Sequence, residues 1–215
     1  MTASLDTIRV AYDGILDRYV ALIKAMARNP LDDALIDAFT ELAGDAGPIA
    51  DLGCGPGWLT ADLASRGHET FGIDLSPEMI QHARATYPEL RFSVGSMTAL
   101  DLPDGGLAGI VSWYSLIHTP PADLPTILAE FHRVLAPGGY VLVGFFSGAD
   151  LDDEPREFDH RVTPGYRWST ARMAGLLAES GLVEVARMVR EPVEGERILR
   201  GYVIARKPAL QDSIG

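Results

Sequence analysis

The spacing of apolar residues predicts a helical N-terminal region. From Leu5 to about Ala27, apolar side chains recur every three or four positions, as they do along one face of an amphipathic helix. A break is expected near Asp13-Gly14, and Asn29-Pro30 ends the region because the residue before a proline avoids helical backbone. A further helix is expected from Leu31 to about Ala43, before a turn cluster at 44–48.

Short apolar runs bounded by turn residues then predict strands, with helical spacing between them. The predicted strands are 49–52, 69–74, 91–94, 109–113 and 140–146, and the predicted helices between them are 58–65, 77–85 and 124–135. A closing helix is expected from Ser169 or Thr170 to Ser180-Gly181, followed by a strand pair at 183–189 and 198–206. This alternation is typical of βαβ units around a parallel sheet, and 215 residues fit one α/β domain.

One long segment interrupts the regular pattern. Residues 147–165 have no regular period and are rich in acidic side chains. Loops of this length in a compact domain are more often lids or binding loops than simple connectors. Its acidic residues are candidates to attract a cationic amine, although such a run is usually a solvated face; they are Asp150, Asp152, Asp153 and Glu154.

Composition and charge narrow the classes of partner. The chain is 47% hydrophobic and 22% charged, which is typical of a globular protein with a buried core. A formal net charge of −12, with no basic run, makes phosphate backbones poor partners, so no nucleic acid is expected. The single cysteine, Cys54, excludes an internal disulfide and fits a reducing compartment. With no signal-like N-terminus and no apolar run of ~18 residues, we expect a cytoplasmic protein without a membrane partner.

The most informative motif is a glycine-rich turn between the first predicted strand and its helix, Asp51-Leu52-Gly53-Cys54-Gly55-Pro56-Gly57. Glycines there allow a tight turn and close approach of a ligand, while free N–H groups of the next helix face an anionic group. Asp74 ends the second predicted strand, where a carboxylate accepts both hydroxyls of a ribose. A simple turn and a cap on Ser76-Pro77 would explain each feature separately, but not their coincidence.

The spacing of the glycines excludes two common nucleotide sites. A dinucleotide fingerprint needs G-x-G-x-x-G, and a phosphate-binding P-loop needs a lysine followed by serine or threonine after its last glycine. The turn here reads G-x-G-x-G with a proline inside it, and neither Lys-Ser nor Lys-Thr follows. A nicotinamide-dependent oxidoreductase is therefore disfavoured.

Together with Gly95-Ser96-Met97 and the run 135–139, these residues resemble the class I S-adenosylmethionine-dependent methyltransferases of the small-molecule type, in order from about Tyr12 to Phe146. The resemblance implies S-adenosylmethionine as cofactor, with S-adenosylhomocysteine as product. It also implies an α/β, Rossmann-like three-layer sandwich whose seven-stranded sheet is mostly parallel with an antiparallel last strand. We expect one methyltransferase domain over 1–215, comprising an N-terminal helical cap (1–46), a cofactor-binding core (47–146), a lid or acceptor loop (147–168) and a C-terminal helix and strand pair (169–215).

The resemblance also assigns roles at the cofactor. Gly53 and Gly55 would lie against its methionine portion, Asp51 would meet its amino group, and Asp74 would hold its ribose. Leu75, Ser96 and Met97 would surround the adenine. Many relatives have an aspartate at the position of Ser96, so in this chain backbone groups would replace the side-chain contact to the adenine amino group. A tyrosine of the N-terminal segment would reach the cofactor carboxylate, with core packing as the alternative for Tyr12 and Tyr19. The full expected set is Tyr12, Tyr19, Asp51, Gly53, Cys54, Gly55, Asp74, Leu75, Ser96, Met97 and Ser112.

The chemistry of methyl transfer requires few catalytic side chains. Holding acceptor, methyl carbon and sulfur in line supplies most of the rate, and a hydroxyl acceptor also needs a base with a pKa near the working pH. His118 is the candidate base because it follows the fourth strand, at the sheet edge where ligands bind. The alternative roles for His118 are to order the loop before Pro120 or to position the cofactor. The residues expected to line the acceptor site are Trp113, His118, His160, Tyr166 and Trp168, although His160 also fits a solvated loop residue.

We therefore expect a methyltransferase acting on an O or N nucleophile of a small molecule, as a monomer or homodimer. No metal site is expected, and Cys54 fits a small packing residue better than a metal ligand or nucleophile. A protein or peptide methyltransferase would need an open groove for its acceptor. A non-catalytic S-adenosylmethionine-binding protein would lack an acceptor cavity.

Overall fold

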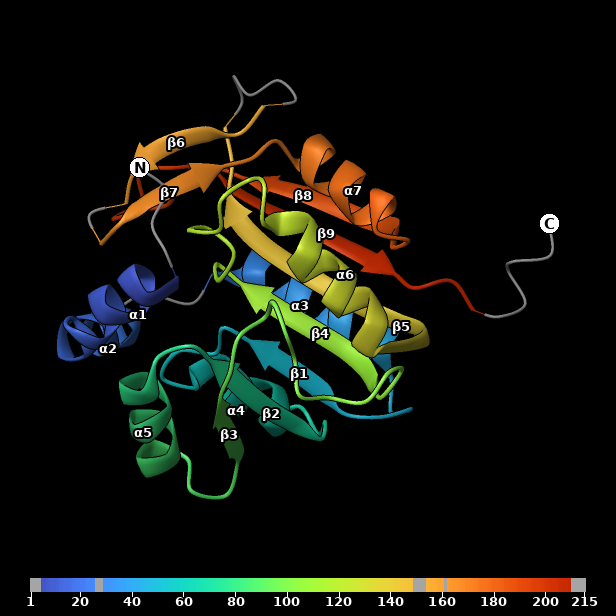
Figure 1. Ribbon diagram of the computed structural model, residues 1–215, viewed down its shortest axis with the longest axis horizontal. Coiled ribbons are helices and arrows are strands. Elements are labelled where there is room, and N and C mark those ends of the chain that lie inside the picture. The colour runs from blue at the N-terminus through green and yellow to red at the C-terminus, as the bar shows by residue number, and fades with distance from the viewer. Residues whose placement is uncertain (1–4, 26–28, 149–153, 161, 210–215) are drawn as a thin grey trace.

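The computed structural model describes residues 5–25, 29–148, 154–160 and 162–209, and its centre is one seven-stranded sheet (Figure 1). The strand order is β3-β2-β1-β4-β5-β9-β8, with β9 antiparallel to both of its neighbours and β1 to β5 parallel. The strands are β1 (Ile49–Leu52), β2 (Thr70–Asp74), β3 (Arg91–Val94), β4 (Leu107–Trp113), β5 (Leu135–Phe146), β8 (Val183–Arg190) and β9 (Arg200–Arg206). The expected mostly parallel sheet with an antiparallel last strand is confirmed.

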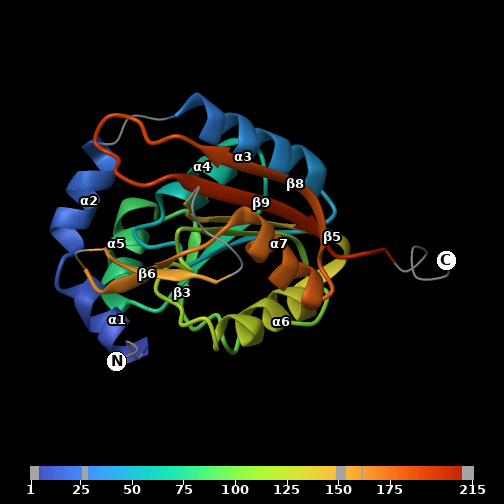
Figure 2. The ribbon, with the colours of Figure 1, turned by 90° about the horizontal axis from the view of Figure 1, so that it is seen from above.

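Helices cover both faces of the sheet (Figures 1 and 2). On one face lie α3 (Pro30–Ala43) and α4 (Trp58–Ser65), and on the other lie α6 (Leu124–Val134) and α7 (Thr170–Glu179). α5 (Pro77–Thr86) packs beside β2 and β3. Hydroxyl or amide side chains of Asn29, Ser76 and Ser169 accept a backbone N–H at the starts of α3, α5 and α7, which satisfies donors that have no partner inside the helix.

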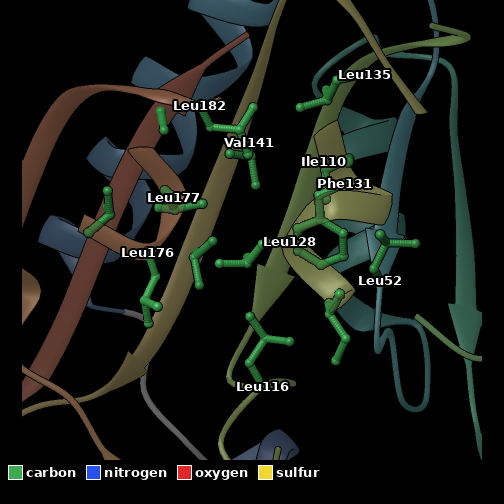
Figure 3. Close-up of a cluster of buried hydrophobic side chains, with 14 of the residues drawn as sticks. Leu52, Ile110, Leu116, Leu128, Phe131, Leu135, Val141, Leu176, Leu177 and Leu182 are labelled. Carbon is green, nitrogen blue, oxygen red and sulfur yellow. The ribbon is translucent and has the colours of Figure 1, made fainter. Parts of the chain in front are cut away.

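The largest part of the core lies between the sheet and the α6–α7 face (Figure 3). Leu52, Ile110 and Val141 come from the central strands, and Phe131 and Leu177 face them from the two helices. Each side chain of this size stabilises the fold by ~1.5–3 kcal/mol when fully buried. Six of the seven residues of β4 are buried, as expected for a strand covered on both faces.

Two segments lie beyond the carboxyl ends of the parallel strands (Figure 1). The N-terminal helical region divides into α1 (Leu5–Asp13) and α2 (Leu16–Ala25), which confirms the expected break at Asp13-Gly14. A hairpin of β6 (Arg156–Asp159) and β7 (Pro164–Arg167) occupies part of the segment in which the sequence showed no regular period. The expectation of an irregular segment was wrong there, because the hairpin is stabilised by distant contacts: the Phe158 ring lies 5.3 Å from that of Phe146, and Tyr166 N–H donates to the Ile117 carbonyl.

Within the described residues, no helix combines the length and apolar character needed to cross a bilayer. The acidic positions Asp150, Asp152 and Asp153 lie outside the described residues, so their expected role stays a prediction.

Candidate active site

The glycine-rich turn joins β1 to α4, and its backbone requires glycine. Gly53, Gly55 and Gly57 have φ angles of 78°, 51° and 86°, a region that other residues rarely adopt. A Cβ on Gly53 would lie 2.1 Å from the Cβ of Ser115, and one on Gly57 would lie 2.8 Å from the Phe92 ring. Gly53 and Gly57 therefore allow close packing inside the protein, whereas a Cβ on Gly55 would meet only Tyr19, at 3.7 Å.

Asp74 stands at the end of β2 and organises this turn. Its Oδ2 accepts the Gly55 N–H at 2.8 Å, and its Oδ1 accepts the Ser76 N–H at 2.8 Å. Burial raises the pKa of Asp74, while these backbone hydrogen bonds oppose the rise. Each carboxylate oxygen has two lone pairs, so both can also accept a ribose hydroxyl. The turn and the carboxylate are thus joined by a hydrogen bond. Separate explanations, a simple turn and a cap on Ser76-Pro77, do not account for this link.

Asp51 lies under the turn and is 1% exposed. Its Oδ2 accepts the Thr60 hydroxyl at 2.7 Å. Burial raises the pKa of Asp51 to about 7, against the Thr60 hydrogen bond, and Asp74 adds to the rise. A cationic amino group brought next to Asp51 would reverse this rise, because an opposite charge favours the carboxylate.

Two cavities meet at the turn. The first, of about 110 Å³, lies beside Asp74 and is flanked by Leu75, Ser96 and Met97. The Ser96 hydroxyl pairs with that of Thr98 at 2.8 Å, so this side chain orders its own loop. The second, of about 330 Å³, extends past Asp51 and Cys54 toward β9. Both cavities are lined by a shared set of residues: Tyr12, Tyr19, Gly53, Gly55, Trp113 and Tyr114.

Tyr12 and Tyr19 come from α1 and α2 and stand between the two cavities. Their rings pack edge to face with centroids 5.7 Å apart. Burial raises the pKa of Tyr19 to about 12, so its phenol keeps its proton and remains a hydrogen-bond donor. The two tyrosines are thus in place to reach a ligand and also pack against each other.

His118 is 4% exposed and joins α1 to the β6–β7 hairpin. Its Nδ1 lies 2.9 Å from the carbonyl oxygen of Pro164, and its Nε2 lies 3.0 Å from the Tyr12 hydroxyl. Because a carbonyl only accepts, Nδ1 carries the proton and Nε2 accepts from Tyr12. Burial lowers the pKa of His118, partly opposed by the Pro164 bond. With both ring nitrogens engaged, this geometry supports a positioning role better than the expected role as a base.

The far end of the second cavity is lined by a buried charged network. Arg190, whose side chain is 4% exposed, donates to Asp32 and to both carboxylate oxygens of Glu196. Tyr202 donates to Asp32 Oδ1 at 2.7 Å and accepts from the Tyr114 hydroxyl at 2.6 Å. Tyr114 has a φ of 55°, the one positive φ at a non-glycine residue within the described part of the chain. The network holds Tyr114 in this strained backbone with its ring facing the cavities.

Sequence reasoning missed this network because its members come from four separate segments. Arg200 belongs to the same region: its guanidinium lies over the Phe146 ring at 4.4 Å and over the Tyr114 ring at 5.1 Å. The available signal was a pair of arginines at one end of the predicted C-terminal strand pair: Arg190 directly follows the first strand and Arg200 lies near the start of the second.

Several predicted site residues lie elsewhere. Ser112 is fully buried and pairs with the Ser115 hydroxyl at 2.7 Å, which in turn donates to the Leu52 carbonyl. Trp168 is 3% exposed within the core and Tyr166 packs against the core, so neither lines the two cavities described.

Cys54 lines the second cavity and also packs with Phe92. Burial raises the pKa of its thiol, so it is no thiolate nucleophile.

His160 is placed differently from the solvated loop residue considered above. Its ring lies 4.9 Å from that of His118 and 5.4 Å from that of Phe146, and it lines the second cavity. Burial, followed by the nearby His118 and Arg200, lowers its pKa to about 4, so the ring is neutral at pH 7. The β6–β7 hairpin therefore brings this histidine to the site.

The residues present fit S-adenosylmethionine. The Asp74 carboxylate, the apolar Leu75 and Met97 side chains, and the buried Asp51 match a ribose, an adenine and an ammonium group respectively. Among the described residues, no group of three or more His, Cys, Asp or Glu side chains is arranged to hold a metal ion.

Comparison with known proteins agrees with this reading. Residues 49–139 match the family model described as a methyltransferase domain. A malonyl-(acyl-carrier protein) O-methyltransferase of Erwinia billingiae is 32% identical over 105 residues, which cover 49% of this chain and 41% of that protein. The matched region thus spans about two fifths of that relative's length.

Solved structures extend the similarity to most of the chain. The 1,6-didemethyltoxoflavin-N1-methyltransferase of Burkholderia thailandensis has a TM-score of 0.77 at 22% identity, covering 94% of this chain and 88% of that one. The 4+2 cyclase SpnF has a TM-score of 0.79 at 16% identity, covering 97% and 98%. At these identities the similarity shows the fold alone. Residues 49–139 therefore match the model of a methyltransferase domain, and the chain shares the Rossmann-like fold of the methyltransferase structures that it matches.

Proposed function

We propose that this chain transfers a methyl group from S-adenosylmethionine to an O or N nucleophile of a small molecule. The observation that carries the proposal is the meeting of two cavities at the glycine turn. The first is lined by the Asp74 carboxylate, which suits a ribose, and by apolar side chains, which suit an adenine. The second is large enough for a further ligand and is lined by aromatic and charged side chains. A methyltransferase needs both spaces, joined at the point of transfer.

Different residues of the chain contact different parts of the cofactor. Bound S-adenosylmethionine would supply an electrophilic methyl group next to a sulfonium charge. Asp74 accepts the ribose hydroxyls and Asp51 pairs with the amino group, which fixes the direction in which the methyl group points. Tyr12, Tyr19 and Tyr114 line the junction of the two cavities, where they exclude water and present ring faces suited to a cation.

His118 positions these walls. Through Tyr12 it holds α1 against the site, and through Pro164 it holds the β6–β7 hairpin. The Asp13 carboxylate, which accepts from the Ser76 hydroxyl at 2.5 Å, gives α1 a second attachment, at the start of α5. These contacts support a site that is closed on the α1 side.

The rival functions lack comparable support. A peptide acceptor would need an open groove, whereas α1, α2 and the hairpin residue His160 line the second cavity. A cofactor-binding protein without an acceptor has no use for that cavity. A protein named as a cyclase shares the fold, however, so activity must be measured directly. We also propose a cytoplasmic location, from the lone Cys54 thiol, and a monomeric or homodimeric state.

Calorimetry with S-adenosylmethionine, S-adenosylhomocysteine and NAD tests the cofactor assignment. We expect binding of the first two and not of NAD, and a loss of roughly tenfold or more in affinity for S-adenosylhomocysteine in Asp74→Asn, because a charge-assisted acceptor is removed. Asp45→Asn, whose side chain is 96% exposed in the turn after α3, is the matched control. Formation of S-adenosylhomocysteine from S-adenosylmethionine in the presence of phenols, carboxylic acids and amines then tests methyl transfer. NAD binding, or unchanged affinity in Asp74→Asn, would refute the assignment.

A further inference from the structure

Arg200 has a buried hydrogen-bond donor with no partner. It begins β9, opposite Phe146 of β5, and is 9% exposed. One terminal nitrogen lies 3.3 Å from a Glu196 oxygen, but Nε lies buried with no acceptor within hydrogen-bond distance. Buried polar atoms without a partner are rare in folded proteins, and each needs an explanation.

A second such atom lies in the same cavity. Three buried side-chain polar atoms in the described part of the chain lack a partner: His160 Nδ1, Arg167 Nε and Arg200 Nε. Arg200 and His160 both line the second cavity. Two residues that each carry an unsatisfied polar atom thus line one cavity, which makes them candidates to bind a polar ligand there.

The local charges identify the sign of that ligand. Four carboxylates also line the cavity: Asp32 and Glu196 accept from Arg190, Asp33 has a contact of its own, and Asp51 is placed for the cofactor's amino group. Arg200 is left with one long contact to Glu196, and the neutral His160 ring adds no charge. The guanidinium lies over the Phe146 and Tyr114 rings, a contact that uses none of the N–H groups at its edge. An anionic oxygen is the acceptor that suits such an edge best.

The other walls identify the shape. The rings of Trp113, Tyr114 and Phe146 line the same cavity. Tyr114 lies 5.5 Å from Trp113 and 5.4 Å from Phe146, centroid to centroid. Aromatic walls of this kind favour a flat ligand that stacks on them.

We propose that the methyl acceptor is a planar aromatic or conjugated acid, whose anionic oxygen, a carboxylate or an ionised phenol or enol, is held by the Arg200 guanidinium beside His160. This deepens the proposed function by naming the substrate class of the second cavity, and it rests on that function.

Matched probes test the charge. With S-adenosylhomocysteine present, calorimetry compares benzoate, 2-naphthoate and indole-3-carboxylate with their carboxamides and with benzylammonium. We expect at least one acid to bind, and to bind roughly tenfold or more tightly than its amide, because hydrogen bonds to charged groups are the stronger ones. Arg200→Gln should remove this preference while S-adenosylhomocysteine still binds, and Arg200→Lys should keep part of it. Arg206→Gln, the same change at the other end of β9, should leave the preference intact.

The outcomes separate this proposal from the cofactor assignment. If S-adenosylhomocysteine binds but no acid does, if acid and amide bind equally, or if benzylammonium binds best, the substrate class is wrong and the cofactor assignment stands. An acid preference that persists in Arg200→Gln would overturn the role of Arg200. Failure of S-adenosylhomocysteine to bind the wild-type protein would instead refute the proposed function. If Arg200→Gln does not fold, the wild-type preference and Arg200→Lys decide.

Discussion

Replacing Asp51 by asparagine is expected to stabilise the cofactor-free protein, increasingly so at higher pH. The carboxyl is 1% exposed and its nearest polar partner is the Thr60 hydroxyl, at 2.7 Å. Asparagine has nearly the same shape, and its side-chain oxygen can accept the same hydroxyl. The substitution therefore removes a buried charge and retains the hydrogen bond from the Thr60 hydroxyl, while the Thr60 backbone N–H loses its charged acceptor.

The magnitude follows from the pKa of Asp51. Burial raises it from 3.8 to about 7, so the folded protein holds this proton at pH values where the unfolded chain has released it. The contribution of Asp51 to wild-type stability therefore falls as pH rises from about 4 to about 7 and is constant above that range. A pKa difference of about 3 corresponds to about 4 kcal/mol, of which roughly 2 kcal/mol is already present at pH 5.5. The stabilisation by Asp51→Asn should thus grow by about 2 kcal/mol between pH 5.5 and 8.5.

Urea denaturation of the two proteins at pH 5.5, 6.5, 7.5 and 8.5 measures this difference. The series starts above the sequence pI of about 4.7, near which solubility falls. Ser65→Ala on α4 is the control, since it changes no ionisable group and its effect should be the same at each pH. A difference between Asp51→Asn and wild type that does not change with pH, or a less stable variant at pH 8.5, would refute the reasoning.

Three further predictions concern the same region. The affinity of wild-type protein for S-adenosylhomocysteine should rise by up to about tenfold per pH unit below pH 7 and then level off, because the Asp51 carboxylate must ionise to pair with the ligand's amino group. Calorimetry should show weaker binding by Asp51→Asn, with less dependence on pH. In His118→Asn the amide N–H can still donate to the Pro164 carbonyl, so a positioning role predicts an unchanged pH–rate profile and a higher rate than in His118→Ala. Loss in both variants of the acid-side limb, the fall in rate at low pH, would restore His118 as the base. Glu196→Gln should lower the free energy of unfolding at pH 7 by about 3 kcal/mol, measured by urea denaturation, because Arg190 loses one of its two carboxylate partners. The control Glu184→Gln, which breaks an exposed pair with Arg187, should lower it by less than about 1 kcal/mol.

The sequence predicted most of the fold because its strands are short apolar runs with clear ends. β1 and β3 have the expected bounds, since glycine or proline follows or precedes them closely. β5 begins at Leu135 and not at Tyr140, because Leu135 pairs with Leu107 across a bulge that no local pattern reveals. The β6–β7 hairpin was missed for a similar reason: contacts of Phe158 with Phe146 stabilise it, and its own sequence does not alternate.

The site divides in the same way. The glycine turn and Asp74 are separated by few residues along a recognisable βαβ unit, so their spacing carries the information. The hydrogen bond between Asp32 and Tyr202 joins positions 170 residues apart, and Arg200 reaches the cavity only because β9 pairs with β5. Sequence spacing cannot show such pairs, and the acceptor side was correspondingly least well predicted.

The two cavities share Tyr12 and Tyr19, but the residues that set their polar character come from different parts of the chain. Asp74, Leu75 and Met97 lie within residues 49–139, whereas Asp32, Ile36, His160, Glu196 and Arg200 lie on either side of that range. The hydrogen bonds of Asp74 lie wholly within that range, so changes at Asp32, Glu196 or Arg200 would alter the second cavity and leave those bonds in place. The second cavity can thus be reshaped for a different acceptor from the segments that flank residues 49–139, while the contacts of Asp74 to the glycine turn stay the same.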